Sequence, residues 1–177
     1  MVTKKSMCVL FVISVISVWI LGSAIQVGAE TMNYKFYVWM NKVEAVSVDD
    51  VEGHIVALAQ RGGFYVLENG EIATTKRVSM NDLVKGAGPA VVYETITFAD
   101  GSTMMLKGQS MLSGTVAGGA HEHTLAEATS EIIKGTGRFD GVKGTQRSKA
   151  KFLPAEKGDA GTKQYGEGTI TYTLPNK

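Results

Sequence analysis

The sequence predicts an all-β protein: a single eight-stranded antiparallel barrel that follows an N-terminal signal peptide. Three observations predict this class. The mature region consists of runs of β-branched and aromatic residues, turn signals separate these runs, and no long amphipathic helix is present. Such runs favour strands. The 21 glycines suit the bulges and bends that a small closed barrel requires.

The strands can be placed from these runs and from the turn signals between them. Asn69-Gly70 and Asp100-Gly101 predict tight hairpins, because type I′ turns need positive φ at both central residues. Residues 123–133 are expected to form a short helix or a loop, and residues 154–163 a long hairpin loop. The expected strands are 34–40, 54–59, 64–67, 90–98, 103–112, 131–134, 142–152 and 164–174.

Residues 1–29 predict a secretory signal peptide. Lys4 and Lys5 give a basic start, an apolar run extends from Met7 to Leu21, and small residues lead up to Ala29. The run is about 15 residues long, shorter than the roughly 20 that a membrane-spanning helix needs, so an uncleaved anchor is the weaker alternative. Cleavage after Ala29 leaves residues 30–177 as the barrel domain, periplasmic or secreted, with no stable membrane anchor.

The cysteine count and the charge balance exclude several modifications and partners. Cys8 is the only cysteine and opens the apolar run instead of closing it, so lipidation is not expected and the mature chain has no disulfide. The chain has 18 basic and 17 acidic residues without a basic cluster, which excludes nucleic acid as an expected partner. No motif for a cofactor is present, so none is expected.

The most distinctive string is Gly135-Thr-Gly-Arg-Phe-Asp-Gly-Val-Lys-Gly144. It lacks the Gly-Lys-Ser/Thr ending of a phosphate-binding loop, so it indicates a glycine-rich turn that leads into a strand. The string resembles a signature of the allene oxide cyclase and dirigent families. Residues 52–54, 68–71 and 100–103 also resemble bacterial proteins of unassigned function with the same barrel.

The resemblance implies an eight-stranded antiparallel barrel with a hydrophobic lumen. It also implies cofactor-free steering of reactive small molecules, either cyclisation of an unstable epoxide or stereocontrol of radical coupling. The catalytic residues of those families do not map onto this chain one by one, so no residue role is carried over from them.

Polar residues on otherwise apolar strands are the candidates for a site in the lumen. Glu94 is the first candidate for an acid or base, because it shares a strand face with three apolar residues. His54 is the second, on a face that it shares with Val56 and Leu58. The candidate ligand-binding residues are Tyr65, Tyr93, Met105 and Lys107.

A weaker alternative is a metal site. His121, His123 and Glu127 have the spacing of the first metal motif of cupins, in which alternating histidines share a metal with a carboxylate. Cupins supply a further histidine from a later motif, whereas the only other histidine here, His54, lies far upstream.

Four functions follow from this sequence. The first is an exported barrel that binds a small hydrophobic molecule in its lumen, and the second is a cofactor-free isomerase or cyclase. The third is a cupin-like metal enzyme. The fourth is a structural subunit with a plugged lumen, whose surface supports a homo-oligomer.

Overall fold

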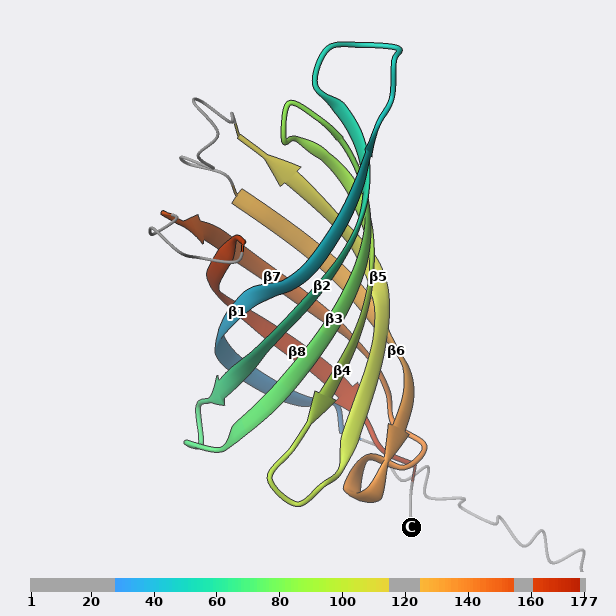
Figure 1. Ribbon diagram of the computed structural model, residues 1–177. Coiled ribbons are helices and arrows are strands. Elements are labelled where there is room, and N and C mark those ends of the chain that lie inside the picture. The colour runs from blue at the N-terminus through green and yellow to red at the C-terminus, as the bar shows by residue number, and fades with distance from the viewer. Residues whose placement is uncertain (1–27, 115–124, 155–160, 176–177) are drawn as a thin grey trace, which may run out of the picture.

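The protein is a closed barrel of eight antiparallel strands (Figure 1). The computed structural model describes residues 28–114, 125–154 and 161–175. Each strand pairs with the next along the chain, and β8 pairs with β1 to close the sheet. The strands are β1 Glu30–Ser47, β2 His54–Leu67, β3 Ile72–Val84, β4 Gly88–Thr97, β5 Thr103–Ser113, β6 Leu125–Thr136, β7 Lys143–Leu153 and β8 Lys163–Thr173.

The predicted fold class is therefore confirmed, although three elements differ from the expected ones. β2 is one strand that continues through Gly62 and Gly63, where two short strands were expected. β3 was not predicted at all. Residues 125–133 belong to strand β6, not to a short helix or loop. Residues 1–27 of the expected signal peptide lie outside the described part of the chain.

Two of the expected hairpins form where they were predicted, but their turns are not of type I′. Neither Asn69 nor Asp100 has positive φ, and the N–H groups of Gly70 and Gly101 donate to the carbonyl oxygens of Leu67 and Phe98, so each glycine is the last residue of its turn. Gly70 has φ of 84° in the connection between β2 and β3, and Gly101 has φ of 81° between β4 and β5. Since L-residues rarely adopt these angles, glycine at each position allows a tight connection between long strands.

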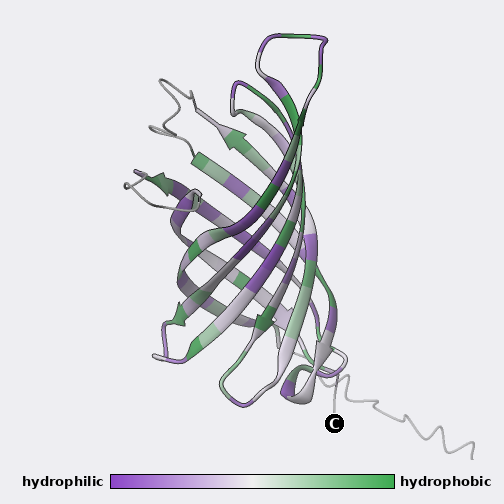
Figure 2. Cartoon of the chain, viewed as in Figure 1, coloured by the Kyte–Doolittle hydropathy of each residue, from purple (hydrophilic) through white to green (hydrophobic). Residues whose placement is uncertain are grey.

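Alternation along the strands gives the barrel an inner and an outer face, visible as bands of polar and apolar residues in Figure 2. The inner face is odd-numbered in β2 and β3 and even-numbered in the other six strands. Glycines on this face make room for aromatic rings: Gly168 lies opposite Tyr34 and Gly166 opposite Phe36, and a Cβ at either glycine would collide with the ring.

The two ends of the barrel are built differently. We call the end that carries the β1–β2 and β3–β4 turns the upper end, and the end that carries the β2–β3, β4–β5 and β6–β7 connections the lower end (Figure 1). The main core fills the lower half of the lumen. Its buried members are Tyr34, Phe36, Val38, Tyr65, Leu67, Ala73, Ile96, Phe98, Met104, Leu106, Ile132, Phe139, Val142, Ala150, Ile170 and Tyr172.

The glycine-rich string closes the lower end. It forms a turn of 3₁₀ helix, η1 (Gly137–Phe139), before β7, in agreement with the turn that the sequence predicted. Phe139 is buried, with its ring centroid 4.6 Å from that of Phe98. Arg138 covers both rings and donates two 2.8 Å hydrogen bonds to the carboxylate of Glu71. This contact ties the β6–β7 connection to the start of β3.

Among the described residues, no helix is long and apolar enough to span a membrane.

Candidate functional site

A polar layer lies inside the barrel between two apolar clusters. Below it is the aromatic core of the lower half. Above it is a smaller group, the upper cluster, which consists of Leu83, Ala90, Leu112 and Phe152 with Ile55 and Ala126 packed against them. The polar side chains that line the space between are Arg61, Arg77, Ser79, Asn81, Glu94, Ser110, Ser130, Gln146, Ser148 and Gln164.

Glu94 on β4 is the centre of a buried hydrogen-bond network, and one of its two carboxylate oxygens takes all the bonds. Tyr65 donates to Oε1 over 2.6 Å, Thr75 over 2.5 Å and the Nε of Arg77 over 2.7 Å. Only 4% of the Glu94 side chain and 13% of the Arg77 side chain are exposed. Within the described residues no hydrogen bond reaches Oε2, which leaves its lone pairs for another donor.

The hydroxyl of Tyr65 acts in this network as both a donor and an acceptor. It accepts from Nη2 of Arg77 over 2.6 Å and from Gln146 over 3.2 Å. Burial raises the pKa of Tyr65 well above its usual value, so the hydroxyl stays protonated and remains a donor to Glu94. Below it, the Tyr65 ring stacks on Tyr34, with centroids 4.3 Å apart and planes 8° apart.

A second arginine stands beside this network with few partners. Arg61 on β2 lies directly opposite Arg77, which in turn lies opposite Glu94, so the three charged residues form one row across β2, β3 and β4. Among the described residues, Arg61 donates only long hydrogen bonds, 3.3 Å to Ser79 and 3.5 Å to Thr162. Its Nε is buried and has no hydrogen-bond partner among the described residues.

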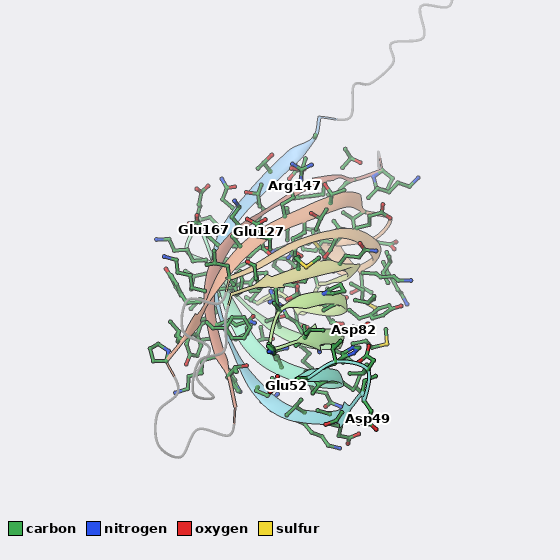
Figure 3. The ribbon with its side chains drawn as sticks, turned by 90° about the horizontal axis from the view of Figure 1, so that it is seen from above. Asp49, Glu52, Asp82, Glu127, Arg147 and Glu167 are labelled. Carbon is green, nitrogen blue, oxygen red and sulfur yellow. The ribbon has the colours of Figure 1, made fainter. Side chains whose placement is uncertain are left out.

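The space that these residues enclose is small, about 50 Å³. This is room for a few water molecules or for the polar group of a ligand, and it is well below the several hundred Å³ of a pocket that encloses a whole organic molecule. A larger hollow of about 1200 Å³ shares Ala90, Ser110, Ala128 and Ser148 with this space. Outward-facing residues also line it, among them Glu127, Arg147 and Glu167, which are labelled in Figure 3. Glu127 there pairs with Lys149 over 3.0 Å.

Two of the predicted site residues face the lumen. Glu94 is 5% exposed and Tyr65 is 1% exposed, and the network joins them directly. Both positions agree with the alternation of buried and exposed residues along β2 and β4. Glu94, for example, shares the inner face of β4 with Ala90 and Ile96.

The lumen position expected for His54 is wrong. His54 does share a strand face with Val56 and Leu58, but that face is the outer one, where Val56 is 47% and Leu58 is 42% exposed. Its Nδ1 lies 2.5 Å from Asp50 and its Nε2 lies 2.7 Å from Asp82, at the upper rim of the barrel. Asp82 is labelled at this rim in Figure 3.

Three of the expected ligand-binding residues also lie outside. Tyr93 and Met105 are 38% and 37% exposed on the outer faces of β4 and β5. Lys107, on the same outer face of β5, places its ammonium 5.4 Å from the centre of the Tyr93 ring. These side chains do not reach the lumen, because each occupies the odd-numbered, outward phase of its strand.

The metal alternative gains no geometric support. His121 and His123 lie outside the described residues, and Glu127 is on the outer face of β6, paired with Lys149. The described part of the chain holds no group of three His, Cys, Asp or Glu that could bind a metal ion.

Sequence reasoning missed Arg61, Thr75, Arg77 and Gln146. Thr75 and Arg77 lie on β3, which was not predicted, and Arg61 lies between the two short strands that were expected in place of β2. On β3 the buried face carries Thr75, Arg77 and Ser79, while exposed Val78 and Met80 occupy the other face. The signal was this inverted alternation, polar inside and apolar outside, across residues 72–84.

The solved structures that resemble this chain include two pterocarpan synthase dirigent proteins. Each is 13% identical to this chain and matches 84% of it, one with a TM-score of 0.48 over 97% of that protein and the other with 0.49 over 89%. Both are described as dirigent proteins, one of the two families that the glycine-rich string resembles. At this identity the likeness concerns the fold alone.

No family model matches the sequence. No curated protein matches it either.

Proposed function

We propose that this protein binds a small, largely hydrophobic molecule at the upper end of its barrel. The polar group of the ligand enters the polar layer, and its apolar part contacts the upper cluster. The ligand is amphipathic in this proposal, because the enclosed space of about 50 Å³ accepts only a polar group.

One observation supports this proposal above the others: the polar layer holds a buried group without a partner. Nε of Arg61 is buried and has no hydrogen-bond partner among the described residues, and no hydrogen bond between described residues reaches Oε2 of Glu94. Native proteins pair nearly all their buried polar atoms, since an unpaired one loses its water without compensation. A purely structural barrel gains nothing from such groups, whereas a binding site uses them to hold a ligand.

The arrangement of apolar residues agrees with entry from the upper end. The lower end is packed with aromatic rings and covered by Arg138, which is bound to Glu71. The upper cluster has fewer and smaller members, with two alanines among its six residues. A ligand that approaches from above therefore meets an apolar rim first and polar groups below it.

The test is a ligand screen with a matched pair of variants. Wild-type protein, melted with a panel of small aromatic and aliphatic alcohols and carboxylates, should show a rise in Tm with some of them. Ala128→Leu places a larger side chain on the wall of the cavity and should abolish the rise. Thr129→Leu, the neighbouring outward-facing position, should keep it.

Native mass spectrometry of protein from its own compartment gives an independent readout. A bound small molecule is expected in the wild type. If the purified protein is consistently empty and no compound of the panel changes its Tm, the proposed binding function is wrong.

A second candidate function, a cofactor-free isomerase or cyclase, rests on Glu94 alone. A carboxylate oxygen that faces an enclosed space can accept a proton from a bound substrate, while Arg77 and Tyr65 hold the other oxygen in place. For any ligand found in the screen, Glu94→Gln should then retain binding and lose turnover. Equal turnover by both proteins rules this candidate out.

We also propose that the chain is exported and cut after Ala29. This places the new N-terminus at Glu30, the first residue of β1. Intact-mass measurement of the secreted protein should give a chain that starts at Glu30, and Ala29→Leu should block or shift the cut because the peptidase needs a small residue there. A full-length intact mass contradicts the proposal.

A further inference from the structure

The charges inside the polar layer do not balance. Of the side chains that line the enclosed space, only Arg61, Arg77 and Glu94 are charged, two cations and one anion. The three stand in one row, with Arg77 between the other two. The described residues therefore leave one positive charge in the lumen without a counter-ion.

Arg77 cannot be the unpaired cation. Its Nε is bonded to Glu94 over 2.7 Å and its Nη2 to Tyr65 over 2.6 Å, and its guanidinium lies 4.6 Å from the centre of the Phe36 ring. These contacts neutralise Glu94 as well, so the carboxylate does not repel an anion strongly from the next position in the row.

The excess charge therefore belongs to Arg61. A guanidinium has five N–H donors, and the partners of this one are two hydroxyl oxygens at 3.3 and 3.5 Å. Both distances are at or beyond the usual range for an N–H···O bond. Burial, together with the charge of Arg77, lowers the pKa of Arg61 to about 10, which shows how poorly its surroundings accommodate the cation.

A neutral donor stands next to it. The Oγ of Ser79 accepts from Nη1 of Arg61 and from Nδ2 of Asn81 over 3.1 Å, so the hydroxyl hydrogen of Ser79 takes part in no hydrogen bond between described residues. A cation with free N–H groups beside a hydroxyl with a free hydrogen is the donor set that a carboxylate or another oxyanion accepts.

We infer that the ligand of this barrel carries an anionic oxygen group, a carboxylate or a similar oxyanion, which pairs with Arg61 and Ser79 inside the lumen. This rests on the proposed function, and it adds the chemical class of the ligand to it. The ligand is an amphipathic anion, with its charged group in the polar layer and its apolar part at the upper cluster.

A pair of probes with the same ring and different charge tests the inference. Benzoate should bind to the wild type about tenfold or more tightly than benzyl alcohol in isothermal titration calorimetry, because only benzoate supplies the counter-ion. Arg61→Gln should remove this preference, because it should weaken the binding of benzoate far more than that of benzyl alcohol. Arg61→Lys, which keeps the charge, should retain part of it, and Lys76→Gln, an exposed neighbour of Arg77 on β3, should behave as the wild type.

The ligand-free protein provides a second readout that does not depend on any probe. Arg61→Met removes a partly buried cation that has no counter-ion among the described residues, and should raise Tm, whereas loss of a structural ion pair would lower it. The expected rise supports the inference, and a marked fall in Tm overturns it because Arg61 is then paired in the free protein.

The outcomes separate the two proposals. If benzoate and benzyl alcohol bind equally and Arg61→Gln changes neither, the anionic class is wrong and the binding function stands. If neither probe nor any compound of the wider panel binds, the binding function fails and the inference fails with it.

Discussion

Glu94 concentrates three hydrogen bonds on one oxygen atom, and its removal should therefore be costly. Glu94→Leu leaves the Arg77 guanidinium buried without its carboxylate, which should lower the free energy of unfolding by about 3–5 kcal/mol. Urea denaturation measures this loss. Tyr93→Leu, the outward-facing neighbour, should cost less than about 1 kcal/mol.

The double variant Glu94→Leu/Arg77→Met should recover most of the loss, because it replaces both buried charges by apolar side chains. If the double variant is as unstable as Glu94→Leu alone, the loss does not come from an uncompensated Arg77.

His54 should give the barrel a pH-dependent contact at its upper rim. The hydrogen bond to Asp50, and then that to Asp82, raise the pKa of His54 above its usual value of about 6.5. A group with a raised folded-state pKa contributes its stability below the unfolded-state pKa, and this contribution is lost as pH rises through the folded-state value. The Tm advantage of wild type over His54→Gln should therefore be larger near pH 6 than near pH 9. A difference that does not change with pH excludes this charge-based role.

At the scale of single strands, the inner glycines of β8 are matched to the aromatic residues of β1. Gly168 lies opposite Tyr34, and its absent side chain leaves the space that the Tyr34 ring occupies. Gly168→Val should force the ring out of its position and lower the free energy of unfolding by about 1–3 kcal/mol. Thermal melts of Gly168→Val and of the neighbour Thr169→Val compare the two positions, and equal effects would show that the ring can move freely.

The strand patterns also show what could be predicted from the sequence. Asn69-Gly70 and Asp100-Gly101 are local turn signals, so the positions of both hairpins were predicted correctly. The predicted turn type was wrong, because only the glycine of each pair has positive φ. β3 was missed because its inner face carries Thr75, Arg77 and Ser79, and a polar inner face is indistinguishable from a solvated one until the partner strands are known.

The candidate site was predicted only in part for a related reason. Glu94 stands among apolar neighbours on its strand face, which marks it as a buried carboxylate even in isolation. The alternation of a strand tells which residues share a face, but not whether that face is the inner or the outer one. His54 and Lys107 were therefore assigned to the lumen although each lies outside it. The pairing of Arg77 with Glu94 depends on strand register, which no local pattern contains.

At the scale of the whole molecule, the ends of the barrel domain meet. Glu30 at the start of β1 pairs with Tyr172 near the end of β8, and the Tyr172 hydroxyl donates to Glu30 over 2.6 Å. A circular permutant that joins residue 175 to residue 30 by a short glycine linker, with new termini between Asp100 and Gly101, should fold into the same barrel.

Circular dichroism and thermal melting of the permutant check this, and its Tm should lie within several degrees of that of the wild-type barrel domain. A second permutant with its new termini between Val78 and Ser79, in the middle of β3, should lose the cooperative melt. Equal behaviour of the two permutants contradicts the importance of an uninterrupted β3.

The pairing of β1 with β8 also affects the order in which the strands pair during folding. The residues that it joins are separated by as many as 142 positions, so β1 has no partner on one side until almost the whole chain has been synthesised. Contacts of such long sequence separation form late and slowly, because the entropy of a large loop is lost before they form. Until then the arginines of the lumen remain hydrated and the sheet is an open ribbon. Closure of the barrel between β1 and β8 should therefore be the last and slowest step of folding, and the long-range pairing of Glu30 with Tyr172 should form only after the seven hairpin-connected strand pairs.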